Sequence, residues 1–118
     1  MRIILVGDRA QLAPALSDAD SAVIDRISIH HAETVLPMDA KPVAVLRRGR
    51  ESSMWNAFEL VTAGEADACV SGGNTAAMMV VGVKLLGMLP GIQRPALMGY
   101  VPNIHAYTGL LDLGANLD

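Results

Sequence analysis

The decisive stretch of this sequence is Ala66-Asp67-Ala68-Cys69-Val70-Ser71-Gly72-Gly73-Asn74-Thr75. Residues 66–71 predict a short strand, and the two glycines turn the chain out of it. Asn74 or Thr75 then caps a helix that runs to about Met88 and is apolar nearly all round, which is typical of a buried helix. A strand that passes through a tight turn into a helix is the repeating unit of α/β proteins.

The same alternation extends on both sides of this stretch. Short β-branched or alternating runs predict strands at residues 2–6, 27–29, 95–101 and 109–113. Helices are predicted at residues 10–16, despite Pro14, and from an N-cap at Ser52 or Ser53 to a stop at Gly64. The run at 42–48 fits either a strand or a helix. The last two strands are too close in sequence for a helical crossover, so that pair is predicted to be antiparallel.

Together these elements predict an α/β fold with a mainly parallel, mixed sheet and helices on both faces. No repeat or low-complexity linker marks a boundary, so residues 1–118 are interpreted as one domain. The chain opens directly on a strand, and no helix follows the last strand to cover it. We therefore expect the domain to be part of a larger chain.

Composition narrows the class of protein. The chain is 52% hydrophobic but only 3% aromatic, so aliphatic side chains and methionine must build the core. A net charge of −3 argues against nucleic-acid binding, which needs a basic face. A single cysteine excludes a disulfide framework and a multi-thiolate metal site. The apolar runs are too short for a signal peptide or a membrane span, which predicts a soluble protein compatible with the cytoplasm.

The turn after the predicted strand at 66–71 is the first candidate site. Ligands of open α/β sheets bind beyond the carboxyl ends of the strands. Gly72 and Gly73 let backbone N–H groups approach an anion, and the following helix N-terminus adds positive potential. Ser71, Asn74 and Thr75 offer further hydrogen bonds. The alternative is a plain glycine turn with an Asn or Thr cap and no ligand.

Two further candidates carry charge. Around Gly114, the side chains of Asp112, Asn116 and Asp118 suit an acid/base or orienting role, or simply an Asx turn. The guanidiniums of Arg47, Arg48 and Arg50 precede a predicted helix start. They suit a phosphate or an acidic carrier protein, or simply a solvated loop.

Other features favour structural roles or exclude whole classes. Cys69 is interpreted as a packed thiol rather than a nucleophile, and Met78, Met79 and Met88 as core residues rather than the lining of an acyl-chain groove. The adjacent His30 and His31 face opposite sides of a strand and cannot share a metal ion. The sequence has no Gly-x-Gly, no Gly-Lys pair and no Gly-x-Ser-x-Gly, which removes the usual dinucleotide, P-loop and esterase motifs.

Several stretches along the chain form one recognisable series: Leu5-Val6-Gly7-Asp8, Asp25-Arg26-Ile27, His31-Ala32-Glu33, Ser52-Ser53-Met54, the stretch 66–75, Gly91-Ile92, Arg94-Pro95-Ala96-Leu97 and the stretch 111–118. In this order they resemble the phosphate acyltransferase family of bacterial phospholipid synthesis. The family usually has Ala where Gly72 stands, and Gly-Ala-Leu where Ala76-Ala77-Met78 stands. The match corresponds to an N-terminal to central part of the family.

This resemblance implies an enzyme that moves a fatty acyl group from acyl carrier protein to inorganic phosphate and so produces acyl phosphate. It also implies a fold like that of isocitrate and isopropylmalate dehydrogenases, a homodimer, and a cytoplasmic protein associated peripherally with the membrane. No cofactor and no metal ion are expected. The competing hypothesis is a truncated, non-catalytic α/β module that binds an anion or a partner.

The resemblance and the motifs together imply roles for individual residues. Phosphate or substrate binding is expected at Ser71, Gly72, Gly73, Asn74, Thr75, Gly114 and Asn116. Catalytic candidates are Asn74, Asp112 and Asn116, and no general base can be named. Acyl carrier contacts are expected at Arg47, Arg48 and Arg50. The 118 residues alone are expected to be inactive.

Overall fold

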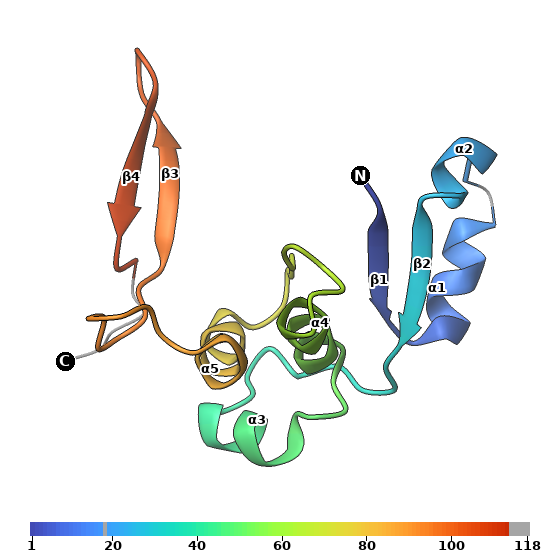
Figure 1. The fold of residues 1–118 in the computed structure, drawn as a ribbon, viewed down its shortest axis with the longest axis horizontal. Helices are drawn as coiled ribbons and strands as arrows, with labels where there is room; N and C mark the ends of the chain where they lie inside the picture. The colour runs from blue at the N-terminus through green and yellow to red at the C-terminus, as the bar shows by residue number, and fades with distance from the viewer. Residues whose placement is uncertain (18, 114–118) are drawn as a thin grey trace. The chain divides into compact units, whose positions relative to one another are not determined.

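A computed structural model describes residues 1–17 and 19–113 (Figure 1). The elements are, in chain order, β1 (Ile3–Gly7), α1 (Arg9–Leu16), α2 (Ser21–Ile24), β2 (Ile27–His31), α3 (Pro42–Arg48), α4 (Ser53–Thr62), α5 (Thr75–Leu86), β3 (Met98–Pro102) and β4 (Tyr107–Leu111). The chain forms two compact units, Met1–Leu86 and Gly87–Asp118. The turn at residues 71–75 belongs to the first unit and Asp112 to the second.

The first unit opens with a parallel strand pair. Strand β1 lies beside β2 in a register that runs from Ile3 opposite Ile27 to Gly7 opposite His31. Helices α1 and α2 connect the two strands and pack against β2 (Figure 1). The Asp8 carboxylate, directly after β1, accepts a hydrogen bond from the N–H of Ala10 at 2.9 Å and caps α1. The predicted strand–helix–strand opening is confirmed.

Helices α3, α4 and α5 hold the core of this unit. The buried apolar side chains that pack together there are Val45, Met54, Trp55, Phe58, Ala77 and Val81. The ambiguous run at 42–48 is a helix, which buries Val45 in this cluster while α3 packs against α5. Pro42 suits its first turn, where the missing N–H has no intrahelical partner to lose.

The ends of α4 follow local chemistry. The buried hydroxyl of Ser52 accepts a hydrogen bond from the N–H of Trp55 at 3.2 Å, which makes Ser52 the N-cap. Gly64 stops the helix with a left-handed φ of 75°, as predicted. Helix α5 ends at Leu86, two residues earlier than expected, and Gly87 follows with a φ of 79°.

The strand predicted at residues 66–71 is wrong. No strand is assigned there, and Val70 is 99% exposed. A strand needs a neighbour that supplies backbone hydrogen bonds, and no other described segment pairs with this one. The structure is thus a mixed α/β fold with a small parallel sheet and helices. The larger mixed sheet of the prediction is not formed among the described residues.

The second unit contains an antiparallel hairpin. Strand β3 pairs with β4 in a register from Met98 opposite Leu111 to Pro102 opposite Tyr107. The antiparallel direction is the one that the short connection predicted. The side-chain oxygen of Asn103 accepts hydrogen bonds from two N–H groups in the connecting loop, at 2.9 and 2.8 Å. This Asx turn sets the direction in which the chain reverses.

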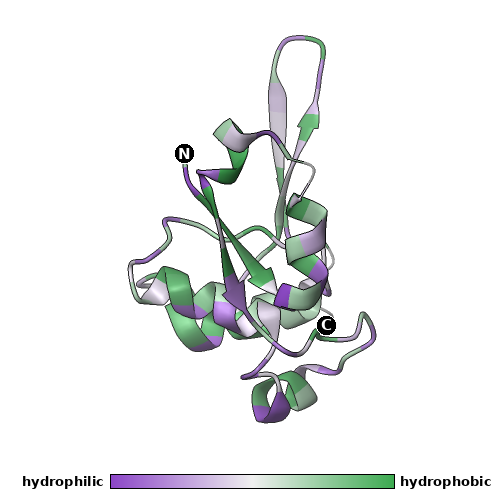
Figure 2. Cartoon of the chain, turned by 90° about the vertical axis from the view of Figure 1, so that its right-hand side faces the viewer, coloured by the Kyte–Doolittle hydropathy of each residue, from purple (hydrophilic) through white to green (hydrophobic). Residues whose placement is uncertain are grey.

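Apolar residues are spread over both strands and helices, with hydrophilic positions between them (Figure 2). Within residues 1–17 and 19–113, no helix combines the length and the apolar character needed to cross a membrane.

Candidate functional site

The turn at residues 71–75 connects an extended segment to α5 in the first unit. The hydroxyl oxygen of Ser71 accepts a hydrogen bond from the N–H of Gly73 at 3.1 Å, which closes the turn on itself. Ser71, Gly72 and Thr75 are exposed, whereas Asn74 is only 7% exposed. The turn therefore presents its hydroxyls and part of its backbone to solvent and points its amide side chain inward.

Asn74 fixes the turn from inside. Its side-chain oxygen accepts a hydrogen bond from the N–H of Ala77 at 2.9 Å, so it caps α5. Its side-chain NH₂ faces three backbone carbonyls, those of Pro37 at 3.4 Å, Met38 at 2.8 Å and Ala40 at 3.2 Å. Every polar atom of the amide is thereby engaged, and Asn74 acts in this structure as a positioning residue for the turn.

The first turn of α5 offers backbone donors. The N–H of Ala77 is taken by Asn74, and the N–H of Met78 by the backbone carbonyl of Asn74 at 2.9 Å. Within the described part of the chain, the N–H groups of Thr75 and Ala76 have no acceptor, and both residues are exposed. Unpaired N–H groups at the start of a helix attract anions, because they add to the positive end of its dipole.

The two glycines of the turn lie in different surroundings. A Cβ atom at Gly72 would meet nothing within 4 Å, which agrees with the alanine expected from the family resemblance. At Gly73 it would lie 3.2 Å from Met54 Cε and 3.3 Å from Ser71 Oγ. Gly73 therefore brings the backbone close to the core, and a larger side chain there would have to displace its neighbours.

The residues predicted at 111–118 belong to the second unit, whereas this turn belongs to the first. Asp112 follows β4 in the second unit, is exposed and has a φ of 60°, a left-handed conformation suited to an Asx turn. Gly114, Asn116 and Asp118 lie outside the described residues. The orienting role assigned to Asp112 and Asn116 stays a prediction.

The three arginines are all exposed. Arg47 and Arg48 form the last turn of α3, where a positive charge complements the helix dipole. Arg50 lies in the loop before α4, with its guanidinium carbon 5.9 Å from the centroid of the Trp55 ring. That stacking favours a defined direction for Arg50.

Among the residues that the structure describes, no group of three or more His, Cys, Asp or Glu is placed to hold a metal ion. His31 is engaged through its ring, whose Nδ1 accepts a hydrogen bond from the N–H of Arg9 at 3.1 Å. Burial raises the pKa of the Cys69 thiol, which keeps it protonated and a poor nucleophile at neutral pH.

An apolar pocket lies between α4, the segment before the turn and α5, where the sequence analysis favoured core packing over a groove. Met78 and Met79, interpreted as core residues, line it. Met78 also packs against the core, so that prediction holds for it in part. The sequence does show apolar residues on both helices that line the pocket. The apolar pattern of one helix does not reveal whether the neighbouring helix fills the space beside it or leaves a pocket.

Comparison with known proteins places this geometry in context. The model of one protein family, described as "Fatty acid synthesis protein", matches residues 1–118. A "Phosphate acyltransferase" of Methylococcus capsulatus is 46% identical over 118 residues, covering 100% of this chain and 35% of that protein. Proteins of the same name from Paramagnetospirillum magneticum and Shewanella amazonensis are 47% and 48% identical and are covered over 33% and 34% of their lengths. The chain thus spans about a third of the length of the curated relatives it matches.

Proposed function

The chain belongs to the fatty acid synthesis protein family, and from this membership we propose that its protein is an acyltransferase of phospholipid synthesis. The proposed reaction moves a fatty acyl group from acyl carrier protein to inorganic phosphate and yields acyl phosphate. Relatives that carry the name phosphate acyltransferase support an acyltransferase. The resemblance of the 66–75 and 111–118 stretches supports the choice of acyl donor and acceptor.

The observation that carries the proposal is the turn at residues 71–75. The unpaired N–H groups of Thr75 and Ala76 and the exposed hydroxyls of Ser71 and Thr75 gather at the positive end of α5. A phosphate needs this set of donors, because its oxygens are strong acceptors with negative charge. The same donors suit the oxyanion that develops on a thioester carbonyl under attack.

In the proposed reaction, phosphate itself is the nucleophile. One phosphate oxygen forms a bond to the thioester carbonyl carbon, the C–S bond breaks, and the carrier's thiolate leaves and takes up a proton. No covalent intermediate on the protein is needed, which agrees with a Cys69 thiol held in its protonated form. The chain contributes by placing hydrogen-bond donors and by aligning the phosphate with the thioester, since orientation accounts for much of such catalysis.

Asn74 supports this role indirectly. Its hydrogen bonds to Ala77 and to the carbonyls of residues 37, 38 and 40 hold the turn in one position before any ligand arrives. Preorganised donors cost nothing to reorient during the reaction. From the family resemblance, Asp112 and Asn116 are proposed to orient the reacting groups, and Gly114 and Asn116 to bind substrate.

The proposed partners follow from charge and family. Acyl carrier protein is proposed to dock at Arg47, Arg48 and Arg50, whose exposed guanidiniums suit an acidic surface. The protein is further proposed to act as a homodimer in the cytoplasm, associated peripherally with the membrane that receives its product. The homodimer, the cytoplasmic location and the membrane association all rest on the family resemblance.

The test is a direct assay on the full-length protein. The thioester of an acyl carrier protein is followed with and without inorganic phosphate, and acyl phosphate is measured as product. Loss of thioester that requires phosphate is the expected result. Phosphate binding without any loss of thioester contradicts the proposal and favours a non-catalytic anion-binding module.

A further inference from the structure

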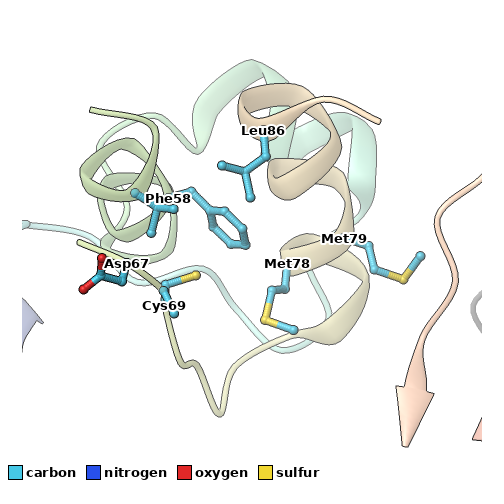
Figure 3. Close-up of a pocket in the computed structure, with 8 residues that line it drawn as sticks. Phe58, Asp67, Cys69, Met78, Met79 and Leu86 are labelled. Carbon is cyan, nitrogen blue, oxygen red and sulfur yellow. The ribbon is translucent and has the colours of Figure 1, made fainter. Parts of the chain in front are cut away.

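An apolar pocket lies between α4, the segment that leads to the turn, and α5. Its volume is about 360 Å³, within the range of small-molecule sites. Figure 3 shows the Phe58 ring in its centre, Leu86 on one side, and Cys69 and Met78 on the other. Every one of these residues belongs to the first unit.

The lining favours an apolar ligand. Asp67 is the only charged residue that lines the pocket, and its carboxylate points away from the interior (Figure 3). The thiol of Cys69 is protonated, because burial raises its pKa. The thioethers of Met78 and Met79 are unbranched and adaptable, a property common at surfaces that accept flexible apolar ligands.

The two segments that flank the turn, the one that enters it and α5 that leaves it, also line the pocket. Cys69 stands two residues before Ser71 on the segment that enters the turn, and Met78 lies in the first turn of α5, which leaves it. Leu86, at the other end of α5, lies about 12 Å further along the helix axis, at 1.5 Å per residue. A ligand with a reacting carbonyl at the donors of the turn and a long apolar tail matches this arrangement.

We infer that this pocket holds the hydrocarbon chain of the transferred acyl group, with the carbonyl end at the turn and the methyl end toward Leu86. The inference rests on the proposed function and adds to it the place of the chain. A span of about 12 Å accommodates on the order of ten extended carbons at ordinary C–C bond lengths.

Leu86 is the residue that limits the chain length. Phe58 also lines the pocket but is buried in the core cluster, where a substitution would disturb α4 and α5. Leu86 is 53% exposed, so its size can change without loss of core packing. A larger side chain at this position closes the far end of the pocket and leaves the turn untouched.

The test compares Leu86→Trp with Val83→Trp in the full-length protein. Val83 is an exposed apolar residue of the same helix that does not line the pocket. The substrates are two thioesters of acyl carrier protein, one with an octanoyl chain and one with a hexadecanoyl chain. We expect Leu86→Trp to lower kcat/KM at least tenfold for the hexadecanoyl substrate and less than twofold for the octanoyl substrate, with Val83→Trp like the wild type. Ala68→Leu, which narrows the pocket from an exposed lining position, is expected to lower binding of both chains.

A binding measurement separates this inference from the proposed function. The fluorescent fatty acid cis-parinaric acid is titrated into each variant without acyl carrier protein or phosphate. Weaker binding to Leu86→Trp and Ala68→Leu, with unchanged binding to Val83→Trp, supports the pocket even if the transfer assay fails. Acyl transfer with the same chain-length profile and the same probe affinity in all variants overturns it, as does absence of probe binding to the wild type.

Discussion

The side-chain amide of Asn74 donates a hydrogen bond to the backbone carbonyl of Met38 at 2.8 Å, and so joins two segments that stand 36 residues apart. The same amide caps α5 through Ala77. One buried side chain therefore connects the loop before α3 to the turn that carries the candidate site. Because both connections meet at one residue, the position of the turn depends on it.

Replacing Asn74 by Ala is expected to lower the free energy of unfolding by about 2–3 kcal/mol. The change removes a helix cap, worth about 1 kcal/mol, and leaves three part-buried hydrogen bonds to backbone carbonyls unmade, at a cost of about 1–2 kcal/mol. Urea denaturation measures the loss. Asp20→Ala, which removes the exposed cap of α2, is the control and should cost less. A loss under 0.5 kcal/mol for Asn74→Ala, on the order of an ordinary surface change, would contradict the structural role.

Gly72→Ala and Gly64→Ala should change stability in opposite directions. At both positions a Cβ atom meets nothing within 4 Å, so steric contact does not distinguish them. Gly64 has a φ of 75°, whereas Gly72 is outside the left-handed region. We expect Gly64→Ala to cost about 1 kcal/mol and Gly72→Ala to gain about 0.4–1 kcal/mol by reducing the entropy of the unfolded chain. Thermal unfolding of the two variants checks the signs; equal shifts would disprove the assignment.

Gly73→Val is expected to abolish phosphate-dependent acyl transfer. The added branches would collide with Met54 and Ser71 and move the backbone donors of the turn. The rate is measured over a phosphate titration. Gly64→Ala serves as a control, because it destabilises the chain outside the turn and should keep the phosphate dependence. An unchanged phosphate titration in Gly73→Val would place the anion site elsewhere, with the Arg47–Arg50 loop next to be tested.

Arg48→Glu is expected to raise KM for acyl carrier protein about tenfold at low salt and to change kcat little. An exposed guanidinium that meets an acidic partner acts mainly on association, and salt screens it. Lys84→Glu makes the same charge change on the last turn of α5 and is the control. Measurement of KM at two salt concentrations checks the prediction. Equal effects of the two variants would show that only net charge matters.

The pKa of Cys69 predicts how stability depends on pH. Desolvation raises this pKa above the ordinary value of 9.0 in the folded chain. The unfolded chain therefore releases the thiol proton at lower pH than the folded chain does. Stability associated with this group is fully present below pH 9.0 and is lost as the pH rises through the folded-state pKa.

The measurement is the difference in unfolding free energy between the wild type and Cys69→Ala, from neutral pH to beyond pH 9.0. We expect the difference to change in favour of the variant as the solution becomes alkaline. The two proteins differ only at residue 69, so contributions from the rest of the chain cancel in this comparison. A difference that stays constant over the whole interval would contradict the burial of the thiol.

Local chemistry made part of this fold predictable. The N-cap at Ser52, the stop at Gly64 and the antiparallel pairing of β3 with β4 each depend on a few neighbouring residues. Each is confirmed, although the two strands span 98–102 and 107–111 rather than 95–101 and 109–113. The helix at 42–48 was left open, because a short apolar run has the same pattern in a strand and in a helix. Burial of Val45 against α5 decided it, which is a tertiary effect.

Long-range contacts decided what the sequence could not show. Residues 66–71 have the composition of a strand, but a strand exists only where another segment pairs with it. The glycine turn was placed correctly, yet the inward direction of Asn74 depends on carbonyls 34 to 37 residues away. The pocket has the same origin, since α4 and α5 each contribute only part of its lining.

Trp55 gives this core an optical use. It is the only tryptophan of the chain, it is 3% exposed, and its indole N–H donates a hydrogen bond to Glu59 Oε1 at 2.7 Å. Indole emission depends on the polarity around the ring, so tryptophan fluorescence from residues 1–118 reports on the α3–α4–α5 cluster. A red shift of that emission would record the opening of the cluster, without any label, while the hairpin of the second unit stays spectroscopically silent at tryptophan wavelengths.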